Sequence, residues 1–405
     1  MGITERQADL LKIIESIDIS PSMYKNAVEK YTSLTKYLGS HGLKAVMYPQ
    51  GSFALGTVTR PYSKEHDRNY DLDFICQVDS SRDEISPKDL RDEIKDILES
   101  GELYGGKLTI NDECFTIEYA DIGSIGFSID IVPAADETYK KKLELKKESN
   151  RPDLIETAIA IPRFSQQKVY NWITNNPKGY REWFSEINLP FARYSYEEYR
   201  QQLYKNNMEL FNSIEEIPTD LYRSPMQRVI QILKYHRDVY YSRVKDGDDL
   251  KPISAIINTV VARIASKAAP TLSPIELLDF VLKEFSIYAK QMNQTEQSFK
   301  QMYSDKLVIQ KRNNKWIIEN PANPEDNLAD RWNLDRRIPK LFFSWAEAAK
   351  NQLVDSLFLS DADFRAKVET AFGRSTVQNG WGSKYNSEPP RIISSHNPPK
   401  PWRLM

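Results

Sequence analysis

Residues 70–78 read YDLDFICQV, and this stretch decides how the rest of the chain is interpreted. Two aspartates, Asp71 and Asp73, stand two positions apart in an otherwise apolar run. Successive side chains of a β-strand point to opposite faces, so both carboxylates share one face while Leu72 and Phe74 face a core. Neighbouring carboxylates repel each other unless a cation lies between them. For an isolated pair of this kind, a solvated strand face is an equally common alternative.

A second strand, FSIDIVPA at residues 127–134, offers a third carboxylate, Asp130. Its alternation places Ser128 and Asp130 on one face and apolar side chains on the other, and we expect Pro133 to end the strand. If the two strands are neighbours, three carboxylates meet on one surface. Ligands that are all oxygen suit Mg²⁺ or Mn²⁺ better than zinc.

Upstream of the acidic strand, Gln50, Gly51 and Ser52 predict a tight turn. The glycine permits close approach of the backbone, and the serine hydroxyl and nearby N–H groups can hold phosphate oxygens. A glycine turn alone is weak evidence, but its combination with three aspartates is strong. Two divalent ions, typically about 3.5–4 Å apart, can activate an attacking hydroxyl and stabilise a leaving pyrophosphate. We expect Asp71 and Asp73 to bridge the ions, and Asp130 to hold the ion near the attacking hydroxyl and to accept its proton.

The composition narrows the class of protein. The chain has 405 residues, with 55 basic and 57 acidic side chains and a net charge of -2, which argues against a generally basic nucleic-acid coat protein. The length predicts two or three domains or one large bilobal unit. Two cysteines favour a reducing, cytoplasmic setting, and no apolar run approaches the roughly 20 residues of a membrane span.

Helical periodicity marks the start of the chain and most of its second half. The helices that we expect cover residues 4–17, 22–39, 87–98, 225–243, 252–267, 273–291, 338–352 and 361–371. Residues 107–120, KLTIND and ECFTIEYA, predict a β-hairpin around Asn111 and Asp112, and the charge run 140–147 predicts a solvated face. From residue 373 onward, Gly, Ser, Asn and Pro predict an irregular tail.

The helix expected at 225–243 carries several polar side chains of interest. His236 lies on its apolar stripe and is expected to be a packed core histidine rather than a ligand. Lys234 lies beside that stripe, and periodicity alone favours an exposed lysine and a ligand-binding one about equally. Arg237 and Asp238 are expected to pair with each other rather than to take part in chemistry.

These residues resemble the DNA polymerase β-like nucleotidyltransferase superfamily, whose pattern is a Gly-Ser turn, two aspartates and then a third. The long spacing from Ser52 to Asp71 and the second half look like the bacterial CD-NTases, relatives of cyclic GMP-AMP synthase and oligoadenylate synthase. The matching stretches are QGSFALGT (50–57), YDLDFICQV (70–78), FSIDIVPA (127–134), MQRVIQILKYHRD (226–238), KPISAIINT (251–259) and WIIENPANPEDNLADRW (316–332).

The resemblance implies an α+β, polymerase β-like fold with a mixed sheet that carries the acids and a helical C-terminal lobe. The implied divisions are a catalytic core with N-terminal helices (1–215), a helical lobe that closes the cleft (216–372) and an irregular tail (373–405). It implies two Mg²⁺ or Mn²⁺ ions on Asp71, Asp73 and Asp130. It further implies a donor triphosphate at the turn of residues 50–52 and at Lys234, with Ser254 as a phosphate or base contact.

The resemblance also implies an activity: successive 2′-5′ or 3′-5′ bonds join NTPs into a cyclic di- or trinucleotide with release of pyrophosphate. ATP, with GTP or a pyrimidine NTP, is the expected substrate, and the setting is CBASS antiphage defence with room for an accessory protein partner. Neither a membrane nor a long nucleic acid is expected as a partner. The same motifs also suit an enzyme that makes a linear oligonucleotide or modifies an RNA, protein or small-molecule acceptor. A non-catalytic module is expected to lack one carboxylate.

Overall fold

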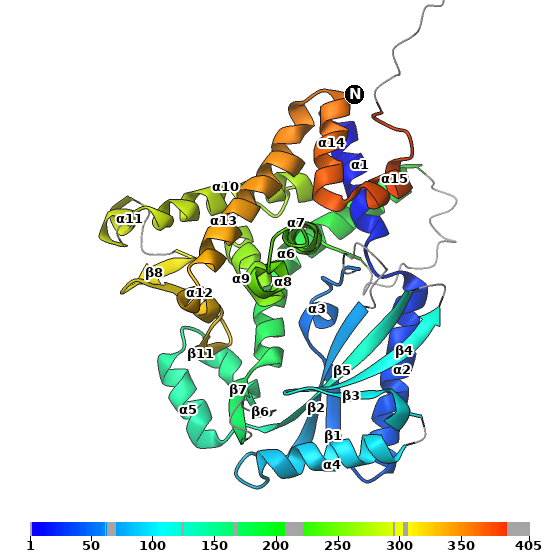
Figure 1. Ribbon diagram of the computed structural model, residues 1–405, viewed down its shortest axis with the longest axis vertical. Coiled ribbons are helices and arrows are strands. Elements are labelled where there is room, and N and C mark those ends of the chain that lie inside the picture. Colours follow the sequence, from blue (N-terminus) through cyan, green and yellow to red (C-terminus); the bar gives the residue numbers. More distant parts are fainter. Residues whose placement is uncertain are drawn as a thin grey trace, which may run out of the picture.

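The protein has two lobes with a cleft between them (Figure 1). A computed structural model describes residues 2–60, 62, 70–101, 103–122, 125–164, 169–206, 222–294, 296–302 and 307–386. One lobe is built on a mixed β-sheet and the other is mainly helical, which confirms the predicted α+β fold. Among the described residues, none of the helices combines the length and the apolar character that crossing a bilayer requires.

The elements follow the predicted periodicity closely. The helices are α1 (Ile3–Ser16), α2 (Pro21–Ser40), α3 (Gly51–Ala54), α4 (Pro87–Ser100), α5 (Tyr139–Glu148), α6 (Pro177–Asn206), α7 (Pro225–Tyr241), α8 (Gly247–Leu250), α9 (Ser254–Ala265), α10 (Pro274–Ala289), α11 (Glu296–Met302), α12 (Asp330–Leu334), α13 (Arg337–Ala349), α14 (Asp361–Phe372) and α15 (Arg374–Trp381). The strands are β1 (Ala45–Pro49), β2 (Tyr70–Ser81), β3 (Leu108–Ile110), β4 (Phe115–Ile122), β5 (Ile125–Asp136), β6 (Ile159–Phe164), β7 (Tyr170–Asn175), β8 (Gln310–Arg312), β9 (Lys315–Ile317), β10 (Glu319–Asn320) and β11 (Asn323–Asn327). All eight helices expected from the sequence are present.

The main sheet has the order β1-β2-β5-β4-β3, and β6 and β7 extend it from β5. Strands β2 and β5 run parallel, and the other pairs are antiparallel. The apolar face of β2, with Leu72 and Phe74 fully buried, packs in one core with residues of α2 and α4 such as Leu34 and Leu90. The opposite face, which carries the aspartates, is therefore left for the cleft.

Pro133 does not end its strand as the sequence suggested, because β5 continues to Asp136. The antiparallel partner β4 pairs with β5 only as far as Ile131, and β6 begins to pair with it at Ala135. Pro133 lies in the gap between these two partners, where an absent N–H costs no ladder hydrogen bond on that side.

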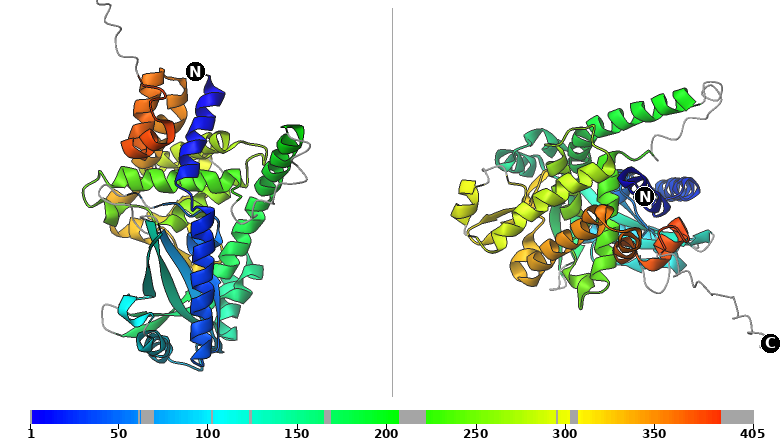
Figure 2. Two further views of the ribbon diagram at one scale, coloured as in Figure 1. Left: turned by 90° about the vertical axis from the view of Figure 1, so that its right-hand side faces the viewer. Right: turned by 90° about the horizontal axis from the view of Figure 1, so that it is seen from above.

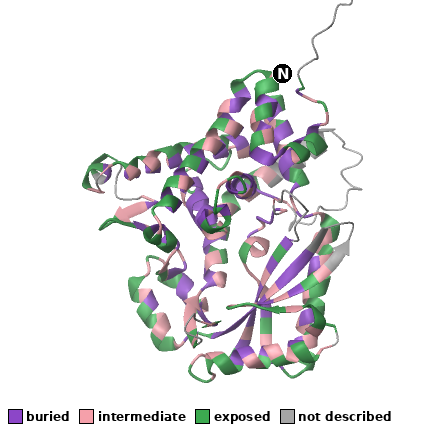
Figure 3. Ribbon diagram, in the orientation of Figure 1, coloured by how far each residue is buried: buried purple, intermediate pink, exposed green. Residues whose placement is uncertain are grey.

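The helical lobe forms one large core around α7, α9, α10 and α13. This core is buried at the centre of the lobe in Figure 3 and contains the enclosed aromatic side chains Trp332, Phe342 and Trp345. Two helices from the first half of the sequence also belong to it: α1 through Leu10 and Ile13, and α6 through residues that include Trp183. Figure 2 shows α6 running along both lobes. The packing therefore crosses the sequence-based division near residue 215.

The start of the tail is helical rather than irregular. Residues Arg374–Trp381 form α15, which contacts α1 and α14. The reason is that Val377 and Trp381 lie four positions apart, on one face of a helix, and both are buried. Residues 387–405 lie outside the described residues, so the expectation for the rest of the tail stays a prediction.

Candidate active site

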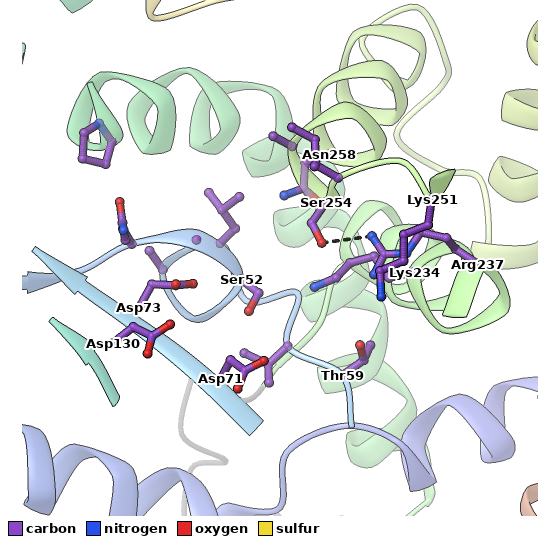
Figure 4. Close-up of a pocket in the computed structure, with 18 of the residues that line it drawn as sticks. Ser52, Thr59, Asp71, Asp73, Asp130, Lys234, Arg237, Lys251, Ser254 and Asn258 are labelled. Carbon is purple, nitrogen blue, oxygen red and sulfur yellow. Dashed lines mark hydrogen bonds between the residues drawn. The ribbon is translucent and has the colours of Figure 1, made fainter. Parts of the chain in front are cut away.

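The cleft between the lobes has a volume of about 1320 Å³. That exceeds the roughly 300–1,000 Å³ that is usual for one small-molecule ligand. The structure brings together at this cleft all eight residues singled out from the sequence: Gln50, Gly51, Ser52, Asp71, Asp73, Asp130, Lys234 and Ser254. Figure 4 shows the aspartates on the sheet and the basic side chains across from them on the helical lobe.

The parallel pairing of β2 with β5 gathers the three carboxylates. Asp73 lies directly opposite Asp130 in the register, and Asp71 lies opposite Ser128. Two hydroxyls orient the carboxylates: Ser128 Oγ donates to Asp71 Oδ1 at 2.9 Å, and Thr116 Oγ1 donates to Asp130 Oδ1 at 2.5 Å. The predicted juxtaposition of the three aspartates is therefore present.

The carboxylates repel one another, and burial adds to the cost of ionising them. Burial, together with the charges of Asp130 and Asp71, raises the pKa of Asp73 to about 7, against a lowering contribution from Lys234. Burial also raises the pKa of Asp130, against the lowering effect of the Thr116 hydrogen bond. An all-oxygen set of this kind fits a hard divalent cation such as Mg²⁺ or Mn²⁺.

The protein alone does not enclose such an ion. In the part of the chain that the structure describes, no three Asp, Glu, His or Cys side chains form a group that could hold a metal ion unaided. Mg²⁺ is usually held by one or two carboxylates together with water and substrate phosphates. The aspartates fit that incomplete kind of site, whose remaining ligands come from the nucleotide.

The turn at Gly51 lies against the acids and requires glycine. Gly51 has φ +58°, and a Cβ atom there would lie 2.4 Å from Oδ2 of Asp73. The backbone N–H of Gln50 donates to the carbonyl of Asp73 at 2.8 Å, which ties the turn to β2. Ser52 follows in the first turn of α3 and faces the cleft in Figure 4. The backbone thus brings Ser52 and Asp73 into one site.

Lys234 is buried, which resolves the ambiguity left by periodicity. It comes from α7, is 6% exposed, and donates from Nζ to the carbonyl of Thr57 at 2.9 Å. Burial, with a contribution from the Arg237 charge, lowers the pKa of Lys234 to about 8. The ammonium group therefore remains mostly charged at neutral pH and lines the cleft.

Ser254 lies in the first turn of α9 and is held by Arg237. The guanidinium donates from Nη1 to Ser254 Oγ at 3.2 Å and to the carbonyl of Pro252 at 3.1 Å. It also forms the predicted ion pair with Asp238, at 2.8 Å. The pairing is confirmed, but Arg237 also lines the cleft, a position that sequence reasoning missed.

Several other cleft residues were not singled out from the sequence, among them Thr59, Lys251 and Asn258 (Figure 4). Asn258 is buried, and its Oδ1 has no hydrogen-bond partner among the described residues. Helical spacing gives a signal for two of the missed residues: Arg237 follows Lys234 by three positions, and Asn258 follows Ser254 by four. Lys251 and Thr59 lie in loops, where no periodicity marks them.

His236 has no part in this site. It is 1% exposed, packs beside Trp345, and has a 3.0 Å hydrogen bond between Nε2 and Oε1 of Gln352. The prediction of a core histidine is confirmed. Asn320 lines the cleft and donates from Nδ2 to Asp326 at 2.9 Å, whereas Trp332 is buried in the helical core at 2% exposed.

Two curated proteins that are similar to this chain are both synthases of cyclic dinucleotides. No family model matches the chain. A c-di-GMP synthase from Roseivirga ehrenbergii is 23% identical over 359 residues, which cover 87% of this chain and 80% of the relative. The cyclic dinucleotide synthase CdnG of Bradyrhizobium diazoefficiens is 22% identical over 335 residues, or 80% of this chain and 70% of the relative.

Solved structures share the fold. The CD-NTase CdnG of Bradyrhizobium diazoefficiens in complex with GTP has a TM-score of 0.63 at 20% identity, over 93% of this chain and 98% of that chain. CdnC of E. coli MS115-1, solved as a CdnC:HORMA-deltaN complex, has a TM-score of 0.56 at 15% identity, over 91% and 97%. The chain is thus similar along most of its length to two curated synthases of cyclic dinucleotides, and it shares its fold with solved bacterial CD-NTases.

Proposed function

We propose that the protein is a cyclic oligonucleotide synthase, which joins nucleoside triphosphates through successive phosphodiester bonds and releases pyrophosphate. The observation that carries the proposal is the set of three carboxylates on the sheet, facing Ser52 and Lys234 across one cleft. The curated relatives support the reaction type, since both are synthases of cyclic dinucleotides.

The residues of the cleft divide the work between them. Ser52 and the adjacent N–H groups at the start of α3 bind triphosphate oxygens, and the Lys234 ammonium offsets their charge. Asp130 accepts the proton of the attacking hydroxyl. Two Mg²⁺ or Mn²⁺ ions, when bound at Asp71, Asp73 and Asp130, supply stabilisation of charge on the attacking and leaving oxygens. The protein mainly positions the reactants, so no covalent nucleophile is needed.

The cleft volume supports the joining of nucleotides to one another. A site of about 1320 Å³ has room for more than one nucleotide, as a cyclic di- or trinucleotide product requires. One solved neighbour, CdnG of Bradyrhizobium diazoefficiens, is in complex with GTP, which supports purine NTPs among the substrates. Another solved neighbour, CdnC of E. coli MS115-1, is in complex with a HORMA protein, which supports an accessory protein partner here. The proposed setting is CBASS antiphage defence in the cytoplasm.

The decisive experiment incubates the purified protein with all four NTPs and Mg²⁺ or Mn²⁺, followed by mass spectrometry. We expect a phosphatase-resistant product that nuclease P1 cleaves if its bonds are 3′-5′, and no product in EDTA. A product that keeps its 5′-triphosphate, or a nucleotide attached to another acceptor, would contradict ring closure. Absence of any nucleotide product would contradict the proposal as a whole.

A further inference from the structure

One face of α7 holds the loop that follows the Gly51 turn. Residues 227, 231 and 234 are spaced by four and then three positions, so they share a helical face. Each donates a hydrogen bond to a backbone carbonyl of the loop formed by residues 55–58. The three bonds run from Gln227 Nε2 to Leu55 O at 2.8 Å, from Gln231 Nε2 to Val58 O at 2.8 Å and from Lys234 Nζ to Thr57 O at 2.9 Å.

Two of these bonds, those from Gln231 and Lys234, are buried, and the bond from Gln227 is partly buried. Gln231 and Thr57 are both fully buried. Leaving a buried carbonyl without its donor costs the full desolvation of that group, so the two buried bonds restrain the loop strongly and the Gln227 bond adds to them. Gly56 lies directly against α7: it has φ +64°, and a Cβ there would lie 2.4 Å from Nε2 of Gln227.

The loop is tied in turn to the catalytic turn. The N–H of Thr57 donates to the carbonyl of Ser52 at 2.9 Å, and the N–H of Leu55 donates to the carbonyl of Gly51 at 3.2 Å. The position of Ser52 above the carboxylates therefore depends on where the loop lies, and the loop is placed by α7.

The same network extends to the junction between α1 and α2. Gln231 accepts a hydrogen bond from Arg228 Nη1 at 2.9 Å, and the same nitrogen donates to Asp18 Oδ2 at 2.9 Å. Asp18 also pairs with Arg223 at 3.2 Å. The bond from Arg228 to Oε1 thus orients the Gln231 amide, so that its Nε2 points to the loop.

Lys234 differs from the two glutamines because it also faces the cleft. A triphosphate bound in the cleft would compete with Thr57 for the Lys234 ammonium group, whereas the two glutamines do not line the cleft. We propose that Gln227 and Gln231 are positioning residues of the transfer reaction, which hold the Gly51–Ser52 turn in place over the carboxylates while Lys234 engages substrate. The inference rests on the proposed function and adds two residues that do not themselves touch the reacting atoms.

The test compares Gln231→Met with a matched control, Gln291→Met. Gln291 is also buried, at 3% exposed, and donates from Nε2 to a backbone carbonyl, that of Ile309, at 2.9 Å, but it lies in the helical lobe away from the cleft. We expect both variants to lower the melting temperature similarly. Only Gln231→Met should raise KM for NTP, by about fivefold, since one net hydrogen bond is lost from the placement of the turn.

A second variant guards against loss of folding. Gln227→Glu keeps the acceptor that the N-cap of α7 uses, because Ser224 N–H donates to Gln227 Oε1 at 2.8 Å, but removes the amide that donates to Leu55. We expect a raised KM with α7 intact. Hydrogen exchange of residues 51–60 in the nucleotide-free protein should also be faster in both α7 variants, Gln231→Met and Gln227→Glu, than in Gln291→Met.

The inference is overturned if Gln231→Met and Gln227→Glu match Gln291→Met in KM and in the exchange of residues 51–60. The exchange measurement needs no turnover, so it separates this inference from the proposed function. If the wild-type protein makes no nucleotide product, the proposed function fails. Unchanged exchange in the variants shows separately that α7 does not hold the turn.

Discussion

At the scale of single residues, Asp73 is the point where three independent features meet. The Gly51 backbone lies against its carboxylate, Asp130 faces it across the strands, and the carbonyl of its own peptide accepts from Gln50. The ionised form of Asp73 is disfavoured, because burial and the charges of Asp130 and Asp71 all raise its pKa. A cation shared with Asp71 and Asp130 would offset this repulsion and favour the ionised carboxylate.

We expect Asp73→Asn to reduce nucleotide transfer by about a hundredfold or more, because the lost charge no longer balances the metal ions. The fold should be preserved, since asparagine has the same size and relieves carboxylate repulsion. The measurements are conversion of labelled NTPs and a thermal melt. Glu118→Gln is the control, as it removes another acid that lines the cleft. Full activity of Asp73→Asn would refute the assignment of the acids.

The sequence predicts the acids better than it predicts the cations. Strand alternation alone places Asp71 and Asp73 on one face, and a parallel neighbour then brings in Asp130. No comparable rule shows that Lys234 is buried, because a long lysine beside an apolar stripe can extend into water or into a cleft. Lys251 was missed for a stronger reason: it lies in a loop, whose path depends on packing between distant elements.

At the scale of elements, α7 serves two environments with its two faces. One face carries Met226, Val229, Ile230, Leu233 and His236 into the helical core, and the other meets the loop at residues 55–58. The helix begins with a capping box at Ser224 and Gln227 and with Pro225 in its first turn, all readable in the sequence. The contacts of Gln231 were not readable, because they depend on a loop that is more than 170 residues away.

His236 should make the stability of the protein depend on pH. Burial lowers the pKa of His236 to about 4, from 6.5 in an unfolded chain. Between pH 6.5 and pH 4, the unfolded state therefore binds a proton at this histidine and the folded state largely does not. Stability is therefore lost as the pH falls from 6.5 towards 4, by roughly 2 kcal/mol at pH 5. Urea denaturation at pH 7.5 and 5.0 measures this loss. The variant His236→Gln should lack that part of the loss, and an equal pH dependence in both proteins would contradict the prediction.

Two elements show where local sequence patterns give the wrong answer. Pro133 suggests the end of a strand, yet β5 continues because β2 still pairs with it there, while on the other side Pro133 lies in the gap between β4 and β6. The composition after Gly373 suggests an irregular tail, yet α15 forms because α1 and α14 offer it an apolar surface. In both cases tertiary neighbours override a local preference.

At the scale of the whole molecule, the two ends of the described chain are fastened together. Trp381 of α15 is 7% exposed, stacks on Phe364 with ring centroids 5.4 Å apart, and donates from Nε1 to the carbonyl of Asp9 at 2.9 Å. The buried carboxylate of Asp9 accepts from Tyr385 at 2.6 Å and from Lys384 at 2.5 Å. These contacts join α1 to the last helix of the helical lobe.

We expect Trp381→Ala to lower the free energy of unfolding by about 3–5 kcal/mol, as large aromatic truncations do in a core. The KM for NTP should stay unchanged, because Trp381 does not line the cleft. Tyr385→Phe, which removes only the hydroxyl bonded to Asp9, is the graded companion and should cost about 1–3 kcal/mol. Denaturant titration checks both variants, and an unaltered transition in Trp381→Ala would show that this junction does not stabilise the fold.

The junction between α1 and α15 has a consequence for how the protein is made. Asp9 and Trp381 are separated by 372 positions along the chain, and the strands of the main sheet all lie between them. In connectivity, the sheet lobe is an insertion within the helical lobe. During synthesis, every strand of the main sheet is therefore made before α15, the helix that packs against α1. A chain that stops before α15 leaves part of the apolar side of α1 uncovered, and exposed apolar surface of this kind is prone to aggregation.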